Sequence, residues 1–200
     1  MRAIRAAVDE KHIGYHGVKN SEIVKKGGLV DEVIDPFVCT DVDPQVRILS
    51  GSPDTDPGWG SDNYGHMHFD DMNNHSIVLR VDVGNGSLLI TGDLEEIAIR
   101  ALVKRYRDTR CLAVDVIPVP HHGSANGTTR ELLVAATPLV ALISTSPPSR
   151  QEDWTAWTYG HPRAAVIDLL EEQVGMTRSA VPVPVARGMK KFDNRVVEKA

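Results

Sequence analysis

The chain has 200 residues, of which 42% are hydrophobic and 24% charged, and its formal net charge is −5 at pH 7. These values are ordinary for one soluble globular domain, which we place at residues 1–200. A negative balance gives no general attraction to nucleic acid, so recognition of a nucleic acid would have to be local or carried by metal ions. The longest apolar stretch, residues 132–143, is interrupted at Thr137-Pro138 and is too short to span a bilayer.

Only two cysteines are present, Cys39 and Cys111, and they lie far apart and outside any C-x-x-C pattern. Buried, reduced thiols are therefore expected rather than a disulfide, which favours a cytoplasmic location. The N-terminus is basic but lacks the long apolar core of a secretory signal peptide.

The first third of the chain predicts little regular structure. Residues 1–15 predict a short helix, and residues 45–49 alternate apolar and polar side chains, as a half-exposed strand does. Residues 54–74 are rich in Asp, Gly, Asn and Pro and predict a long surface loop.

The middle of the chain predicts strand, strand, helix and strand. Residues 76–83 and 87–91 flank Gly84-Asn85-Gly86, a hairpin signal. Residues 94–107 carry apolar side chains at helical spacing, and residues 113–120 form another apolar run. The last three of these segments predict one crossover of a layered α/β fold.

The last third predicts shorter elements. A capping box at residues 128–131 opens a brief helix to Ala136, and residues 139–144 predict a buried strand. His161-Pro162 opens an amphipathic helix through Val174, with the proline in the first turn. Residues 181–197 hold one or two weak strand signals.

Polar residues follow both strands of the predicted crossover. Asp93 follows the first strand, and His121 begins the sequence His-His-Gly-Ser after the second. The carboxyl ends of strands are where α/β proteins build sites, and a two-metal hydrolase needs a carboxylate that bridges ions about 3.5–4 Å apart. We therefore predict that Asp93 and His121 are metal ligands. Asp93 also fits the D-x-x-E form of a helix cap with Glu96, and this alternative stays open.

Three neighbours are candidates for catalysis: His122, Ser124 and His161. Adjacent strand residues point to opposite faces, so only one histidine of the pair faces the site unless the backbone turns, which Gly123 permits. Ser124 could donate a hydrogen bond to a phosphate, and His161 precedes a helix whose free N–H groups attract anions. The alternatives are a surface loop for the histidine pair, an ordinary turn serine, and a histidine that only packs.

Residues 66–71 read His-Met-His-Phe-Asp-Asp and contain H-x-H-x-D, a pattern found in metal clusters. The segment lies in the polar loop without a preceding buried strand, and its last position is Asp rather than His. We therefore expect no metal site there. His12 and His16 are expected to be surface or packing residues.

Four segments in this order resemble the metallo-β-lactamase fold family, in particular the soluble hydrolase domain of the DNA-internalisation competence protein ComEC and its stand-alone relatives. They are residues 73–80, 88–95, 119–124 and 160–162. The resemblance implies a four-layer αββα sandwich with two zinc or manganese ions between its sheets and nuclease action on DNA phosphodiesters. It also implies that Asp93 bridges the metals, that His121 is a ligand, and that His122, Ser124 and His161 contact metal or substrate.

The chain departs from this family in one respect. The principal metal motif of the family, H-x-H-x-D-H, precedes all of the matched segments, and no buried strand followed by such a motif occurs before residue 46. We therefore expect an N-terminally truncated metallo-β-lactamase-like domain, whose site a missing half or a partner chain would complete. A degenerate relative without full metal binding is the alternative.

The resulting functional hypothesis is a metal-dependent hydrolase that cleaves a phosphodiester such as DNA. With two protein ligands, the chain alone is expected to bind metal weakly and to turn over little. One alternative is a non-catalytic binding or interaction domain. The other is a lactone or small-ester hydrolase, which would share the metal chemistry.

Overall fold

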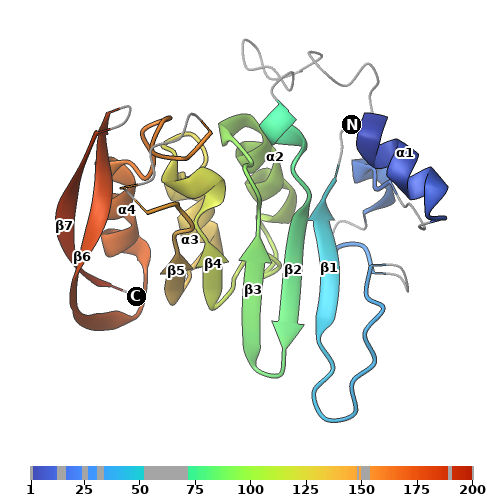
Figure 1. The fold of residues 1–200 in the computed structure, drawn as a ribbon. Helices are drawn as coiled ribbons and strands as arrows, with labels where there is room; N and C mark the ends of the chain where they lie inside the picture. Colours follow the sequence, from blue (N-terminus) through green and yellow to red (C-terminus); the bar gives the residue numbers. More distant parts are fainter. Residues whose placement is uncertain are drawn as a thin grey trace.

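The structure is a computed structural model that describes residues 2–12, 17–23, 27–30, 34–51, 72–147, 149, 154–188 and 191–199. Helices and strands alternate through most of this part of the chain (Figure 1). In chain order they are α1 (Arg2–Glu10), η1 (Asn20–Glu22), β1 (Gln45–Ser50), η2 (Met72–His75), β2 (Val78–Val83), β3 (Gly86–Ile90), α2 (Glu96–Tyr106), β4 (Val116–Pro118), η3 (Pro120–Gly123), α3 (Arg130–Ala136), β5 (Val140–Leu142), α4 (Ala164–Gln173), β6 (Thr177–Gly188) and β7 (Lys191–Lys199).

Five strands form one mixed sheet in the order β1-β2-β3-β4-β5. The strands β1, β2 and β3 are antiparallel, and β3, β4 and β5 are parallel. The predicted hairpin is therefore confirmed as β2 and β3, and the predicted crossover as β3, α2 and β4. A second crossover through α3 leads to β5, so the carboxyl ends of β3 and β4 lie at one edge of the sheet.

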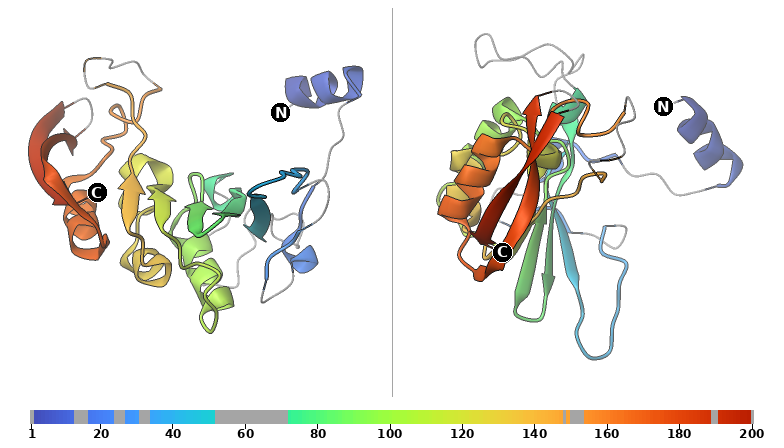
Figure 2. Two further views of the ribbon diagram at one scale, coloured as in Figure 1. Left: turned by 90° about the horizontal axis from the view of Figure 1, so that it is seen from below. Right: turned by 60° about the vertical axis from the view of Figure 1, so that its left-hand side comes forward.

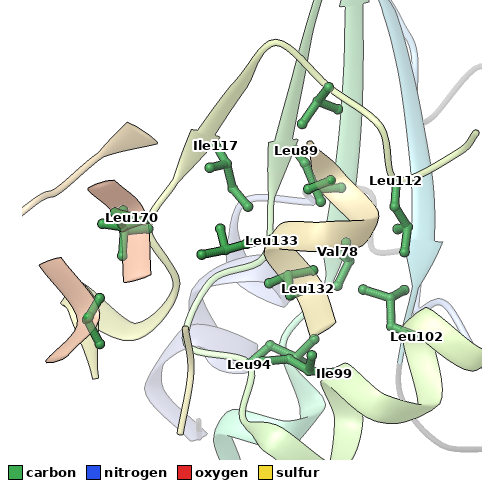
Figure 3. Packing of buried hydrophobic residues seen from close by; sticks show 14 of the residues in the cluster. Val78, Leu89, Leu94, Ile99, Leu102, Leu112, Ile117, Leu132, Leu133 and Leu170 are labelled. Atoms are coloured by element: carbon green, nitrogen blue, oxygen red, sulfur yellow. The ribbon is translucent and has the colours of Figure 1, made fainter. Parts of the chain in front are cut away.

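The helices α2, α3 and α4 lie on one face of this sheet (Figure 2). Their apolar residues recur three or four positions apart, so each helix presents one stripe to the strands. The main core forms between this stripe and the inward side chains of the strands, as Figure 3 shows. Its fully buried members include Val78, Leu89, Ile99, Ile117 and Leu132.

The opposite face of the sheet is apolar as well. Leu79 pairs with Ile90 and Val81 pairs with Leu88 across β2 and β3, and Leu88 pairs with Val116 on β4. Directly paired residues point to the same face, so these side chains alternate with those of the core. All five are only partly buried. The strand β3 is therefore apolar on both of its faces.

Two arginines of the sheet share one carboxylate. The guanidinium groups of Arg47 on β1 and Arg80 on β2 both donate to Asp82, and Arg80 also donates to the carbonyl oxygens of residues 110, 111 and 113. Burial raises the pKa of Asp82, but the two guanidinium groups outweigh it, so the pKa lies below its ordinary value.

The chain ends in a hairpin of its own, which forms a separate two-stranded sheet. Its strands β6 and β7 pair from Thr177 with Lys199 to Gly188 with Lys191. Val185 and Val197 belong to the main core, so the hairpin packs against it. The weak strand signals in this region are confirmed.

The predicted α/β class is confirmed by the mixed sheet and its helices. The four-layer αββα arrangement stays a prediction. The part of residues 54–74 that precedes Met72, including His66 to Asp71, lies outside the described residues, as does His16.

Three details of the sequence interpretation are wrong. The segment predicted as a buried strand at residues 139–144 is the edge strand β5, and Leu142 is 53% exposed. Neither cysteine forms a disulfide, but Cys39 is exposed rather than buried. The last long helix begins at Ala164, so Pro162 precedes its first turn. Among the described residues, every helix is too short or too polar to cross a bilayer.

Candidate functional site

A cleft of about 800 Å³ opens at the edge where β3 and β4 end. Such a volume falls within the range of about 300–1,000 Å³ that is common for ligand sites. The walls come from the segments that follow β3 and β4, from η2, and from the turn before α4. Its lining residues are Asn73, Asp93, Glu95, His121, Ala125, Asn126, Tyr159, His161 and Arg163.

Asp93 lies in the short turn between β3 and α2 and lines this cleft. The helix begins only at Glu96, and its N-cap position is taken by Glu95, which makes no side-chain capping bond. Asp93 therefore does not cap the helix, and its carboxylate is left for the cleft.

The histidine pair adopts an uncommon backbone conformation. His121 and His122 have φ values of 48° and 55°, and Gly123 follows at 85°. Residues with a Cβ avoid this left-handed region, at a cost of about 1–2 kcal/mol each. The backbone turn that would let both histidines approach one site therefore occurs, and it begins at the histidines themselves.

His121 lines the cleft and lies against Glu95. Its Nδ1 is 3.3 Å from Oε1 of Glu95, and the same oxygen accepts a hydrogen bond of 3.1 Å from the side-chain amide of Asn73. The contact with His121 does not have hydrogen-bond geometry, and among the described residues its buried Nδ1 has no hydrogen-bond partner. One carboxylate oxygen thus joins η2, the start of α2 and the turn after β4.

His122 lies on the other side of the turn, against Asp93. Its Nε2 is 3.8 Å from Oδ1 of Asp93, and its Nδ1 is 2.7 Å from the carbonyl oxygen of Ser144. A carbonyl oxygen only accepts, so Nδ1 carries the proton and, in the neutral ring, the lone pair is on Nε2. An imidazole oriented by a carbonyl in this way is a common form of metal ligand.

His161 lies deep in the cleft wall, 8% exposed, with its ring edge-on to that of His121 at a centroid distance of 5.3 Å. Burial, together with the neighbouring His121 and Arg163, lowers the pKa of His161 to about 4. The ring is therefore neutral at pH 7. Among the described residues, its buried Nδ1 has no hydrogen-bond partner.

Ser124 lies beneath the turn and is 1% exposed. Its hydroxyl oxygen accepts a hydrogen bond of 2.9 Å from the backbone N–H of Gly127, and the residue is not part of the cleft wall. A Cβ on Gly127 would stand 2.6 Å from Cβ of His121. Ser124 and Gly127 thus support the backbone that carries His121.

The predicted site residues are brought together in part. Asp93, His121 and His161 line one cleft, and His122 lies beside Asp93. The close contacts in the site pair Asp93 with His122, and Glu95 with His121. Among the described residues, no group of three or more His, Cys, Asp or Glu side chains is arranged to hold a metal ion. Side chains of the types that coordinate divalent metals therefore occur here as carboxylate–imidazole pairs.

Sequence reasoning missed several residues of the cleft. Glu95 looked like an ordinary first-turn residue of a helix, and only the late start of α2 places it in the wall. Tyr159 and Arg163 flank His161, and the single available signal was their closeness to it in sequence. Asn126 follows the histidine turn without any motif of its own.

No protein-family model matches the chain. Its sequence is 38% identical to Recombination protein 2 of Haemophilus influenzae over 93 residues, 44% of this chain and 10% of that protein. It is 32% identical to ComE operon protein 3 of Bacillus subtilis over 99 residues, 50% of this chain and 11% of that protein. The chain is similar to competence proteins. Competence protein ComA of Neisseria gonorrhoeae is 35% identical over 96 residues, 48% of this chain and 12% of that protein.

The matches to these competence and recombination proteins span about a tenth of their length. The similarity therefore concerns one part of much longer proteins.

Proposed function

We propose that this chain contributes one side of a metal-dependent phosphodiesterase site that acts on DNA. The observation that carries the proposal is the cleft at the ends of β3 and β4, which gathers the carboxylate of Asp93 and the imidazoles of His121 and His161, whose buried Nδ1 atoms have no hydrogen-bond partner among the described residues. Unpaired buried polar atoms are costly, and a metal ion is one partner that would satisfy imidazole nitrogens.

Asp93 and His121 are the ligands that we propose from this chain, and His122 is the alternative partner of Asp93. When bound, divalent metals would supply a polarised water and charge stabilisation for the leaving oxygen. Further ligands are needed, because the described donors occur in pairs and a catalytic zinc usually takes three. Because this chain would supply only two ligands, we expect it to bind metal weakly on its own.

The other residues of the cleft would orient what binds there. Glu95 accepts a hydrogen bond from Asn73 and lies 3.3 Å from Nδ1 of His121, so it would help to position one wall of the cleft. The neutral ring of His161 would accept or donate one hydrogen bond rather than form an ion pair with a phosphate. The names of the relatives, which refer to competence and recombination, support DNA as the substrate.

Calorimetric titration of the 200-residue chain with Mn²⁺ or Zn²⁺ tests the ligand assignment. We expect Asp93→Ala and His121→Ala each to weaken metal binding at least about tenfold, because each removes a direct ligand. His122→Ala then decides which imidazole accompanies Asp93. Hydrolysis of bis(4-nitrophenyl) phosphate, measured with the same variants, should be slow and should fall in parallel with metal affinity.

Two exposed residues outside the cleft wall provide controls. Asp108→Ala removes a carboxylate just after α2, and His12→Asn removes an imidazole while keeping a residue type that tolerates its φ of 51°. Both should bind metal as the unaltered chain does. Equal metal affinity in the Asp93, His121 and control variants would refute the ligand assignment.

A further inference from the structure

Two residues of the cleft wall have no part in the contacts among Asp93, Glu95 and the histidines. Tyr159 is 59% exposed, and Arg163 is exposed as well. Both line the cleft, and they flank His161 in the sequence. Among the described residues, no ion pair occupies the guanidinium of Arg163. The wall of the cleft thus carries an exposed aromatic ring and an exposed cation.

The backbone that carries these two side chains is well anchored. The N–H of Tyr159 donates to the carbonyl of Ala156 at 3.1 Å, and the next residue donates to that of Trp157, whose own ring is 1% exposed. The N–H of Arg163 donates to the carbonyl of Gly123 at 3.0 Å, which ties it to the histidine turn. Binding would therefore order side chains only, which lowers its entropic cost.

An aromatic ring and a guanidinium in the wall of one cleft are two parts from which proteins build sites for single strands. Bases stack on aromatic rings, and arginine binds the backbone phosphates. In a duplex the base faces are already stacked on each other, so an exposed ring finds a partner only on an unpaired base. The net charge of −5 agrees with this local form of recognition, since the chain has no general attraction for a polyanion.

We propose that Tyr159 and Arg163 form a subsite for single-stranded nucleic acid, in which Tyr159 stacks on a base and Arg163 binds a neighbouring phosphate. This inference rests on the proposed phosphodiesterase site, because it places the scissile strand beside His121 and His161. It assigns a substrate form, an unpaired strand or strand end, to a cleft whose metal ligands leave that choice open.

Fluorescence anisotropy with a labelled oligothymidine of about 10 nucleotides, a length within the site sizes of single-strand binders, tests the subsite. The measurement is made in EDTA, so that no turnover occurs, and is repeated with a blunt duplex of the same length. We expect the single strand to bind at least about fivefold more tightly than the duplex. Tyr159→Ala should weaken single-strand binding by about fivefold or more, and Tyr159→Phe should bind as the unaltered chain does.

Arg163 is tested through the salt dependence of binding. Removing one phosphate contact should lower the slope of log K against log salt by about 0.7 for a single strand. Arg163→Gln should show this loss, and Arg163→Lys should keep the slope. Phe37→Ala and Arg107→Gln remove an exposed ring and an exposed cation outside the cleft wall, and neither should alter binding.

The outcomes separate this inference from the proposed function. Equal affinity for single strand and duplex, unchanged binding by Tyr159→Ala, or no measurable binding of the oligothymidine overturns the subsite. Metal-dependent hydrolysis of bis(4-nitrophenyl) phosphate, which has no base to stack, would in those cases still support the phosphodiesterase. A single-strand preference that depends on Tyr159, in a chain without any metal-dependent hydrolysis, supports the subsite and overturns the phosphodiesterase.

Discussion

Gly127→Ala is a direct test of how the histidine turn is supported. A Cβ at this position would stand 2.6 Å from Cβ of His121 and 2.8 Å from Oγ of Ser124. Gly127 does not have a left-handed φ, so alanine is acceptable to the backbone and only space is lacking. Since a Cβ is fixed to its own backbone, His121 cannot escape by changing rotamer. The whole turn must move.

Forcing an extra methyl group into a well-packed site costs about 1–3 kcal/mol. For a chain of this size, that corresponds to a fall in Tm of about 2–12 °C, measured by circular dichroism, with urea unfolding as a second measure. The displaced His121 should also weaken Mn²⁺ binding. Gly27→Ala is the control, because nothing lies within 4 Å of its added Cβ. A Gly127→Ala variant as stable as this control, with unchanged metal affinity, would refute the reasoning.

Three further predictions concern the scaffold. Thr129→Ala should cost about 1 kcal/mol, because the Thr129 hydroxyl accepts from the N–H of Leu132 at the start of α3, and urea unfolding should find Thr129→Ser nearly unchanged. Asp82→Asn should cost about 1–3 kcal/mol at pH 7, through its lost charged hydrogen bonds. Because the folded-state pKa of Asp82 lies below 3.8, that difference should persist at neutral pH and vanish as pH falls through the folded pKa; a difference unchanged at low pH would contradict it. Ile117→Ala should cost about 2–5 kcal/mol by the same measurement, whereas Leu142→Ala, at an exposed edge, should cost far less.

The strand ends of the cleft could be predicted from the sequence, and its other wall could not. Asp93 and His121 follow apolar runs whose length and β-branched content indicate strands, so their common edge follows from parallel crossovers. Glu95 depends on the residue at which α2 begins, and helix boundaries are poorly determined by periodicity. Tyr159 reaches the cleft through a loop whose path depends on tertiary contacts such as the buried ring of Trp157.

The left-handed conformation of His121 and His122 shows a second reason why the sequence does not predict the whole site. Local preference places a non-glycine residue in this conformation only rarely, so Gly123 alone looked like the turn. The surrounding contacts override that preference at His121 and His122. Such strained positions concentrate at functional sites, which agrees with the place of His121 in the cleft wall and of His122 beside Asp93.

The alignment of the two cleft walls is governed from the far end of the sheet. Because β3 is apolar on both faces, the alternation of its side chains does little to select a register against β4, and a slip of one residue would carry His121 about 3.3 Å past Asp93. At the opposite end, the carboxylate of Asp115 accepts from both the N–H and the hydroxyl of Ser87 at 2.7 Å, and these bonds hold the pKa of Asp115 below its ordinary value. These hydrogen bonds hold the start of β3 and the start of β4 in their observed register. The contact between Ser87 and Asp115 thus helps to fix the register on which the alignment of Asp93 and His121 depends.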